Sequence, residues 1–278
     1  DFCLSRGLGD VYKRQDVVYP VPETFYDKYE GRIAASEQEM NIIKDMDLVY
    51  DLKMADKENE IHTTTGLEEN GRNLYNRMTP AQKAAWDKHY DPIIKKFKEQ
   101  KLTGKALAEW KYQQYMHDYM RVIHSVDRNV GRVLDYMEKS GLLENTIIVY
   151  TSDQGFYMGE HGWFDKRFMY EESFRTPLII RYPAKIKAGS ECTALVQNID
   201  YAPTYLDIAG IEKPDYMVGT SLVPLFGGET PKDWREYLYY HYYDYPAIHM
   251  VRRHDGVRDS RYKSVSYTHL TLPTILRV

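Results

Sequence analysis

An amphipathic stripe followed closely by an apolar run constrains the fold of this chain most strongly. Between Tyr115 and Met137, apolar side chains recur at steps of four and three residues, which is the spacing of one face of an α-helix. Gly141 follows, and glycine suits the left-handed conformation that ends many helices. The run TIIVYT (146–151) comes next, with apolar side chains on both faces, as in a strand inside a covered parallel sheet. Together they predict a helix that leads into a buried strand.

The following residues continue this alternation of helices and strands. PLIIRYP (177–183) predicts a second buried strand, and residues 199–210 predict a short helix that ends at a glycine. We therefore predict an α/β fold with a mainly parallel sheet flanked by helices. From about residue 233, short aromatic and β-branched runs are separated by Asp-Gly and Pro, which predicts a small antiparallel C-terminal subdomain.

Two helix starts are predicted nearer the N-terminus. Ser36, with a glutamate three residues later, fits a capping box. Thr79, with Pro80 at the first helical position and Gln82 at the third, is typical of another helix start. The stretch 51–76 is polar and irregular, and we expect it to be an insertion or a surface loop.

The length and composition are those of a globular protein with a sizeable core. The chain has 278 residues, of which 43% are hydrophobic and 28% charged. Its net charge is -4 and its basic residues are scattered, so a nucleic-acid partner is not expected. No apolar run approaches the ~20 residues that cross a bilayer, so no membrane span is expected. Two cysteines are too few for a disulfide framework and leave the compartment open.

The two ends of the chain differ in character from their neighbours. Residue 1 is Asp rather than Met, so we expect a fragment of a longer protein. Residues 1–15 and 265–278 lack an amphipathic period that joins them to the rest, and we expect non-native tails there, with ordinary frayed termini as the alternative. The expected domains are a partial α/β domain over 16–232 and the start of the C-terminal subdomain over 233–264.

A carboxylate and an amide stand at the end of the first predicted strand. Asp153 and Gln154 follow the apolar run, and ligands of open α/β sheets bind at the carboxyl ends of strands. Their oxygens are hard donors, which suit Ca²⁺ or Mg²⁺ rather than zinc. Such a cation takes about six to eight ligands, so other segments must supply the rest. A polar turn in which Asp153 caps backbone amides is the alternative, and spacing alone does not exclude it.

Several motifs in order carry a family resemblance. HSVDRNVGRVLDYMEKSGLLENTIIVYTSDQG is followed by GEHGWFDK, ESFRTPLIIRYP and DYAPTYLDIAG. This combination, over about residues 110–225, resembles the C-terminal half of type I (formylglycine-dependent) sulfatases of the alkaline phosphatase-like superfamily. The flanking segments VVYPVPETFYDKYEGR and HMVRRHDGVRDSRYK look like those of bacterial members that act on sulfated sugars.

The resemblance implies roles for five residues. In sulfatases, an Asp-(Asn/Gln/His) pair after the strand binds a catalytic divalent cation, usually Ca²⁺ and less often Mg²⁺, and this pair maps onto Asp153 and Gln154. A lysine about a dozen residues later binds the sulfate oxygens and maps onto Lys166, whose ammonium would stabilise charge developing on those oxygens. His161 is expected either to contact the substrate or to brace the loop. His254 is expected to reach the substrate from the C-terminal subdomain.

The nucleophile that the resemblance implies is absent from this sequence. It is a formylglycine made from the Cys or Ser of (C/S)-x-P-x-R, and none of the 12 prolines has Cys or Ser two residues before it. We therefore expect the fragment alone to be inactive, because the N-terminal half would carry the nucleophile and further metal ligands.

The parent enzyme is expected to hydrolyse sulfate esters of glycans such as glycosaminoglycans, in the periplasm or after secretion. One alternative is a fragment of a phosphodiesterase or phosphonate hydrolase of the same superfamily. The other is a non-catalytic remnant that binds sulfated glycan. The sequence does not indicate an oligomeric state.

Overall fold

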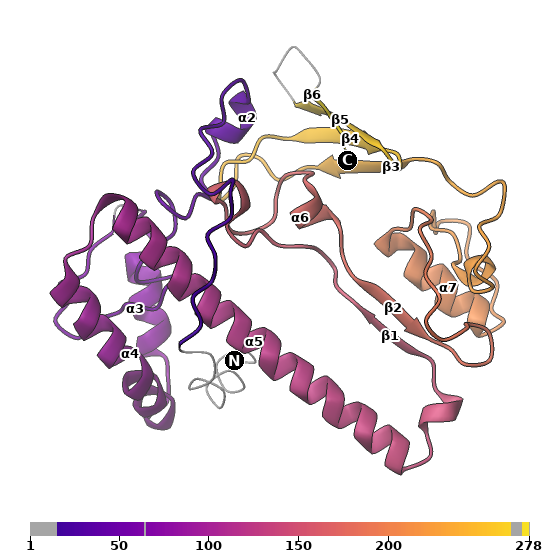
Figure 1. The fold of residues 1–278 in the computed structure, drawn as a ribbon, viewed down its shortest axis with the longest axis horizontal. Helices are drawn as coiled ribbons and strands as arrows, with labels where there is room; N and C mark the ends of the chain where they lie inside the picture. Colours follow the sequence, from indigo (N-terminus) through magenta and orange to yellow (C-terminus); the bar gives the residue numbers. More distant parts are fainter. Residues whose placement is uncertain (1–15, 64, 268–273, 278) are drawn as a thin grey trace. The chain divides into compact units, whose positions relative to one another are not determined.

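The computed structural model describes residues 16–63, 65–267 and 274–277, the last four by their backbone alone. The predicted tail 1–15 lies outside these residues. The chain divides into two compact units, each assembled from separate segments (Figure 1). Unit 1 comprises Asp1–Arg32, Gln38–Lys139 and Tyr157–Asp165, and unit 2 comprises Ile33–Glu37, Ser140–Phe156 and Lys166–Val278.

Unit 1 contains the helices α3 (Glu68–Asn76), α4 (Pro80–Gln100) and α5 (Gly104–Lys139). The predicted start of α4 is confirmed. Thr79 Oγ1 accepts a hydrogen bond from the backbone of Gln82, and the Gln82 side chain accepts one from the Thr79 amide. The predicted amphipathic helix is confirmed as part of α5, which begins eleven residues before the apolar stripe.

Helix α3 lies in the stretch that we predicted to be irregular, so that prediction is wrong for residues 68–76. The helix is polar, and an ion pair between Glu68 and Arg72 at i,i+4 supports it. Gly71 lies against the backbone of Val49, where an added Cβ would come within 2.7 Å of the Val49 carbonyl. This helix is therefore fixed by charge pairing and a close backbone contact, neither of which gives an apolar period.

The predicted helix start at Ser36 is also wrong. A short helix, α2 (Ile33–Ser36), ends at this residue instead of beginning there. The Ser36 hydroxyl donates to the carbonyl of Ile33 at 2.8 Å, so it bonds within the preceding turn and does not cap a following one.

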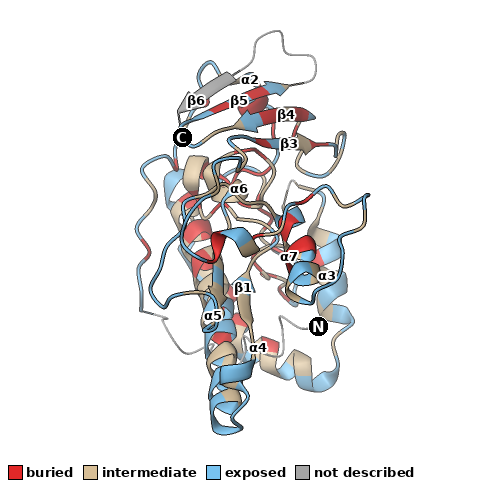
Figure 2. Ribbon diagram, turned by 90° about the vertical axis from the view of Figure 1, so that its right-hand side faces the viewer, coloured by how far each residue is buried: buried red, intermediate tan, exposed pale blue. Residues whose placement is uncertain are grey.

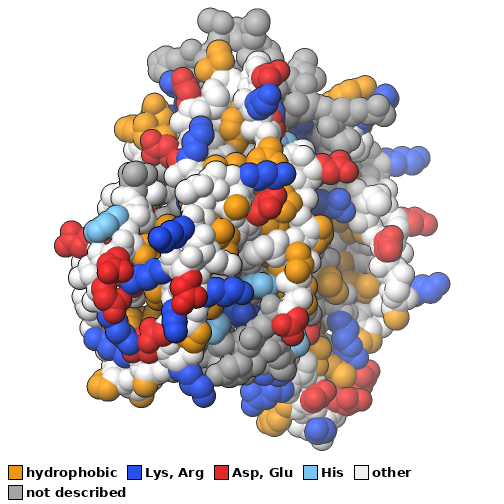
Figure 3. Space-filling model, turned by 60° about the vertical axis from the view of Figure 1, so that its left-hand side comes forward, with side chains coloured by type: hydrophobic (Ala, Val, Ile, Leu, Met, Phe, Trp, Pro, Cys, Tyr) orange, Lys and Arg blue, Asp and Glu red, His pale blue; other side chains and the backbone are white. Residues whose placement is uncertain are grey.

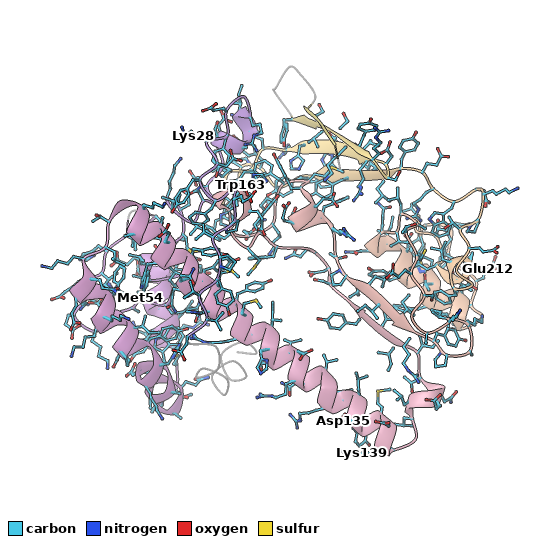
Figure 4. The ribbon with its side chains drawn as sticks, viewed as in Figure 1. Lys28, Met54, Asp135, Lys139, Trp163 and Glu212 are labelled. Atoms are coloured by element: carbon cyan, nitrogen blue, oxygen red, sulfur yellow. The ribbon has the colours of Figure 1, made fainter. Side chains whose placement is uncertain are left out.

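The core of unit 1 forms where its N-terminal loops meet the segment 157–165. The Phe164 amide donates to the Met40 carbonyl at 3.0 Å, and Asn41 pairs with Trp163 in an isolated antiparallel bridge. Trp163 is fully buried (labelled in Figure 4; buried residues are red in Figure 2). Other fully buried side chains of this unit are Phe25, Ile42, Met46, Val49, Leu52, Met54 and Tyr157.

Unit 2 contains two sheets and short helices, which confirms the α/β class and the antiparallel C-terminal sheet (Figure 1). Strands β1 (Ile148–Thr151) and β2 (Leu178–Arg181) form a two-stranded antiparallel sheet. This pairing differs from the parallel arrangement that the apolar runs predicted. Tyr150 is 46% exposed and Ile179 63% exposed, so within the described residues these strands are only partly covered. An apolar run does not report strand direction.

The C-terminal sheet has the order β3-β4-β5-β6 and is antiparallel throughout. Side chains alternate along β3, where Leu238 and Tyr242 are buried and Tyr239 is exposed. This is the pattern of a sheet with one packed face. The bounds are β3 (Leu238–Tyr242), β4 (His254–Arg258), β5 (Tyr262–Tyr267) and β6 (Thr274–Arg277), so β5 and β6 extend into the predicted tail 265–278.

The Asp255-Gly256 pair, which we predicted to separate strands, lies inside β4. An added Cβ at Gly256 would come within 2.1 Å of the Met169 sulfur. Glycine is present here because another part of unit 2 approaches the strand closely, and no turn is formed.

In unit 2, an apolar cluster lies beside α7 (Tyr201–Ile208), with Leu222, Leu225 and Phe226 at its centre. Partly buried side chains of β2, including Leu178 and Ile180, pack against it. The helix α6 (Glu171–Phe174) precedes β2.

Acidic and basic side chains are interspersed on the face drawn in Figure 3. Among the described residues, no helix combines the length and the apolar character needed to cross a membrane.

Candidate functional site

Strand β1 leads into a bend that carries Asp153 and Gln154 and that we call the β1 turn. The Ser152 hydroxyl donates to the Gln154 carbonyl at 2.8 Å and lies 3.5 Å from the Gln154 amide nitrogen. The turn is thus held by Ser152, and not by Asp153 as the alternative interpretation required. The Asp153 residue is exposed, and its Oδ1 atom lies 3.4 Å from the Ser152 hydroxyl, whose proton is donated to the Gln154 carbonyl. Its carboxylate therefore retains acceptor capacity for a cation.

The backbone of the same turn is anchored on both sides by hydrogen bonds. The Gly155 amide donates to the Ser173 carbonyl of α6 at 2.9 Å. An added Cβ at Gly155 would lie 2.1 Å from the Glu172 carbonyl oxygen, so only glycine fits. On the other side, Nδ2 of Asn198 donates to the Asp153 carbonyl at 2.6 Å. Sequence reasoning missed Asn198, because a side chain that binds a distant backbone carbonyl leaves no spacing signal.

Lys166 lies at the start of the next segment of unit 2. Its side chain is half-buried, and its ammonium lies 5.6 Å from the ring centroid of Phe156, in a cation–π contact. Lys166 thus belongs to the same unit as Asp153 and Gln154.

His161 belongs to unit 1, in the loop between Phe156 and Lys166. Its φ of 58° is left-handed, and three contacts hold it there. Its amide donates to Thr24 Oγ1 at 3.0 Å, its carbonyl accepts from the Tyr29 hydroxyl at 2.5 Å, and Nδ1 donates to Asp27 Oδ2 at 2.8 Å. The side chain is 16% exposed, and these contacts hold the loop in place. The expected contact of His161 with the substrate stays a prediction.

Asp27 receives several hydrogen bonds besides that of His161. Arg32 donates to both carboxylate oxygens at 2.5 Å, and the Tyr29 amide donates at 2.9 Å. Burial alone would raise the pKa of Asp27, but these hydrogen bonds outweigh it and lower the pKa to about 2. Asp27 therefore stays ionised at neutral pH and fixes the middle of the loop that precedes Lys166.

His254 lies in the interior of unit 2, on β4, with no exposed surface. Its ring stacks on Tyr242 and Phe168 at centroid distances of 5.2 and 6.0 Å, and Nδ1 donates to the Arg252 carbonyl at 2.8 Å. Burial lowers its pKa, which favours the neutral imidazole. The ring thus packs inside the sheet, and among the described residues its Nε2 atom has no hydrogen-bond partner. The substrate contact of His254 stays a prediction.

The donors at the β1 turn fit part of a hard-cation site. Asp153 and Gln154 offer carboxylate and amide oxygens, the ligand types of Ca²⁺ and Mg²⁺. Within the described residues, no group of three or more His, Cys, Asp or Glu side chains could hold a metal ion. The turn supplies two oxygen donors, and the binding of a cation by Asp153 and Gln154 stays a prediction.

Comparison with protein families gives two matches. A family model described as "Sulfatase" matches residues 22–211, which is more than half of the chain. A second, described as "N-sulphoglucosamine sulphohydrolase, C-terminal", matches residues 159–272. The two matches overlap across the loop that carries His161 and Lys166.

Two curated relatives are sulfatases that are longer than this chain. An N-acetylglucosamine-6-O-sulfatase of Bacteroides thetaiotaomicron is 50% identical over 255 residues, which cover 91% of this chain and 45% of the relative. The N-acetylglucosamine-6-sulfatase of Homo sapiens is 42% identical over 113 residues, which cover 40% of this chain and 20% of the relative. The chain thus spans less than half the length of these relatives.

Solved structures extend the likeness to the fold. One, described as a complex with its substrate D-glucosamine-2-N,6-O-disulfate, superposes with a TM-score of 0.87 at 47% identity, covering 98% of this chain and 55% of the other. The phosphonate monoester hydrolase of Silicibacter pomeroyi gives a TM-score of 0.57 at 26% identity, covering 74% of this chain and 40% of the other. Family, relatives and fold agree, and the chain belongs to the sulfatase family of the alkaline phosphatase-like superfamily.

Proposed function

We propose that this chain is the part of a sulfatase that supplies Asp153 and Gln154 to a Ca²⁺ site and Lys166 to the sulfate group. The observation that carries the proposal is the β1 turn, where a serine and two backbone anchors hold the turn while the Asp153 carboxylate is left exposed. A carboxylate that only stabilised the turn would itself accept the backbone amides.

The proposed reaction is hydrolysis of a sulfate ester of a glucosamine-type sugar, at the 6-O position, within glycosaminoglycans. It breaks the S–O bond and yields the free alcohol and sulfate. The substrate class is supported by the names of the N-acetylglucosamine-6-sulfatase relatives and by the disulfated glucosamine bound in the similar structure.

Each proposed residue has a distinct task. A divalent cation, when bound, supplies positive charge to the sulfuryl oxygens. Asp153 and Gln154 would bind that cation at the end of β1. Lys166 adds a second fixed charge, and a fixed charge beside a developing oxyanion is worth about 3 kcal/mol. The family also implies a formylglycine nucleophile, whose motif this sequence lacks, so we expect no turnover from this chain alone.

The proposed enzyme works outside the cytoplasm, in the periplasm or after secretion, where sulfated glycans are met. A phosphonate or phosphodiester hydrolase is the second candidate, and the structural likeness to the phosphonate monoester hydrolase favours it over other enzyme classes. Both candidates share a need for metal at the β1 turn, so they differ in the substrate turned over and not in the site.

The test uses the full-length parent enzyme with glucosamine 6-sulfate as substrate and metal content as a second readout. We expect Asp153→Ala to lose bound Ca²⁺ and activity together. Lys166→Ala should retain Ca²⁺ but lose about 100-fold in kcat/KM. Lys185→Ala is the matched control, because Lys185 also lies over an aromatic ring of unit 2, at 5.9 Å from the centroid of Tyr182.

Two results would contradict the proposal. Full metal content in Asp153→Ala would remove the turn from the metal site. A loss in Lys166→Ala no greater than that in Lys185→Ala would remove Lys166 from the substrate site. Turnover of a phosphonate monoester with none of the sulfate ester would assign the second candidate function instead.

A further inference from the structure

We propose that Asn198 is a positioning residue that orients the peptide joining the two proposed metal ligands. The inference rests on the proposed function, because it concerns the same Ca²⁺ site. The Asn198 side-chain amide donates to the carbonyl of Asp153 at 2.6 Å. That carbonyl belongs to the peptide bond between Asp153 and Gln154, so one hydrogen bond sets the plane from which both ligand side chains leave the backbone.

A hydrogen bond positions a turn only if its donor is itself fixed, and Asn198 begins a 3₁₀ helix (Asn198–Asp200) that is held in place. Asp200 is fully buried, and its carboxylate accepts from the amides of Gln197 and Thr220 at 2.7 and 2.8 Å. Arg235 donates to both oxygens of the same carboxylate, at 2.6 and 2.7 Å. Such a bidentate pair is geometrically specific, so it fixes the end of the 3₁₀ helix.

Close backbone packing fixes the middle of the 3₁₀ helix. An added Cβ at Gly219 would lie 1.9 Å from the Ile199 carbonyl oxygen, so the two backbones touch there. The Thr204 hydroxyl donates to the Asp200 carbonyl at 2.5 Å and accepts from the Leu222 amide at 2.9 Å. The donor that reaches the ligand turn therefore stands on a segment with little freedom to shift.

The turn that carries the two proposed metal ligands is thus held by a hydrogen bond on each side. Asn198 holds the Asp153 carbonyl, and the Ser173 carbonyl holds the Gly155 amide two residues later. Gln197, beside Asn198, donates to the Tyr239 carbonyl of β3 at 3.3 Å, and this hydrogen bond connects the Asn198 segment to the C-terminal sheet. Groups that hold metal ligands in place commonly change metal affinity by about 10–100-fold when removed. Removal of the Asn198 amide should therefore weaken metal affinity by a similar factor, although Asn198 contacts neither metal nor substrate.

The experiment measures Ca²⁺ binding to the metal-stripped parent enzyme by calorimetry, with thermal unfolding at saturating Ca²⁺ alongside. Asn198→Leu keeps the number and branching of the side-chain heavy atoms but removes the donor, and Asn198→Ser is a second, smaller variant that cannot reach the carbonyl. We expect both to weaken Ca²⁺ binding by about 10–100-fold. Asn198→Gln, which keeps an amide donor, should recover part of that loss. Ile199→Ala, at a half-exposed position of the same 3₁₀ helix, is the matched control and should bind Ca²⁺ as the wild type does.

The outcomes separate this inference from the function on which it rests. If Asp153→Ala loses Ca²⁺ while a folded Asn198 variant binds it within twofold of the wild type, the positioning role is refuted and the metal site stands. If Asp153→Ala keeps Ca²⁺, the proposed site itself fails. A merely structural role would lower the unfolding temperature of the Asn198 variants at saturating Ca²⁺ without weakening Ca²⁺ binding, and this result would also overturn the inference. Should Asn198→Leu fail to fold, Asn198→Ser decides.

Discussion

Replacing Asp27 with Asn should destabilise unit 1 in a way that depends on pH. The carboxylate of Asp27 joins Arg32 and His161, which are far apart in sequence, and its side chain is 16% exposed. Asparagine has the same shape but no charge, so it imitates the protonated carboxyl. The substitution therefore isolates the contribution of the ionised form.

The magnitude follows from the pKa of Asp27. A fall from the ordinary value of 3.8 to about 2 corresponds to about 2.4 kcal/mol of stability at neutral pH. Because the folded-state pKa is depressed, this stability is fully present above the ordinary pKa and is lost as the pH falls through about 2. At about pH 3, roughly half of it should remain.

The assay is urea unfolding of the wild type and Asp27→Asn from neutral pH down to about pH 3, followed by a probe in unit 1 such as tryptophan fluorescence. The difference in unfolding free energy should be about 2.4 kcal/mol at neutral pH and should narrow by roughly half at the acid end. Glu69→Gln removes an exposed carboxylate of the same unit and should leave stability within about 0.5 kcal/mol of wild type.

A difference that stays constant across this pH range would refute the reasoning, because it would show that the charge of Asp27 is not what stabilises the loop. A difference that widens in acid would contradict the sign of the pKa change. Protection of the loop amides from hydrogen exchange offers an independent check, since loss of the His161 contact should raise exchange there first.

Two further substitutions test the anchors of the β1 turn. Gly155→Ala should displace the turn, because the new Cβ would lie 2.1 Å from the Glu172 carbonyl oxygen, and metal analysis of the parent enzyme should show loss of bound Ca²⁺. The control is Gly131→Ala, in open space on α5, which should be neutral or slightly stabilising. Equal behaviour of the two variants would exclude the steric explanation. Arg235→Met should leave the buried Asp200 carboxylate unpaired and cost about 3–5 kcal/mol in urea unfolding, whereas a loss under about 1 kcal/mol would mean that the pair contributes little.

Features encoded by neighbouring residues were predictable from the sequence. The capping box at Thr79 and the apolar stripe of α5 depend on side chains within a few turns of one another, so their spacing is visible. The placement of Asp153 and Gln154 at the end of a strand followed from the same local reading. Their roles came from the family resemblance, which the ordered motifs made specific.

Features that depend on distant partners were not predictable. The antiparallel pairing of β1 with β2 is fixed by residues about thirty positions apart, which an apolar run does not report. Helix α3 is stabilised by the contact of Gly71 with Val49, and Gly256 lies in a strand because Met169 packs against it. Likewise, Asn198 reaches a carbonyl 45 residues away. In each case the deciding contact is tertiary, and one sequence shows only one side of it.

The segment Tyr157–Asp165 has a consequence for protein engineering. The chain leaves unit 2 at Phe156, adds nine residues to the core of unit 1, and returns to unit 2 at Lys166. A chimera with a relative therefore cannot exchange unit 1 through a single crossover. An exchange that omits this segment would pair Trp163 of one parent with the foreign N-terminal loops of the other. Recombination within the family should accordingly favour variants in which these loops and this segment are inherited together.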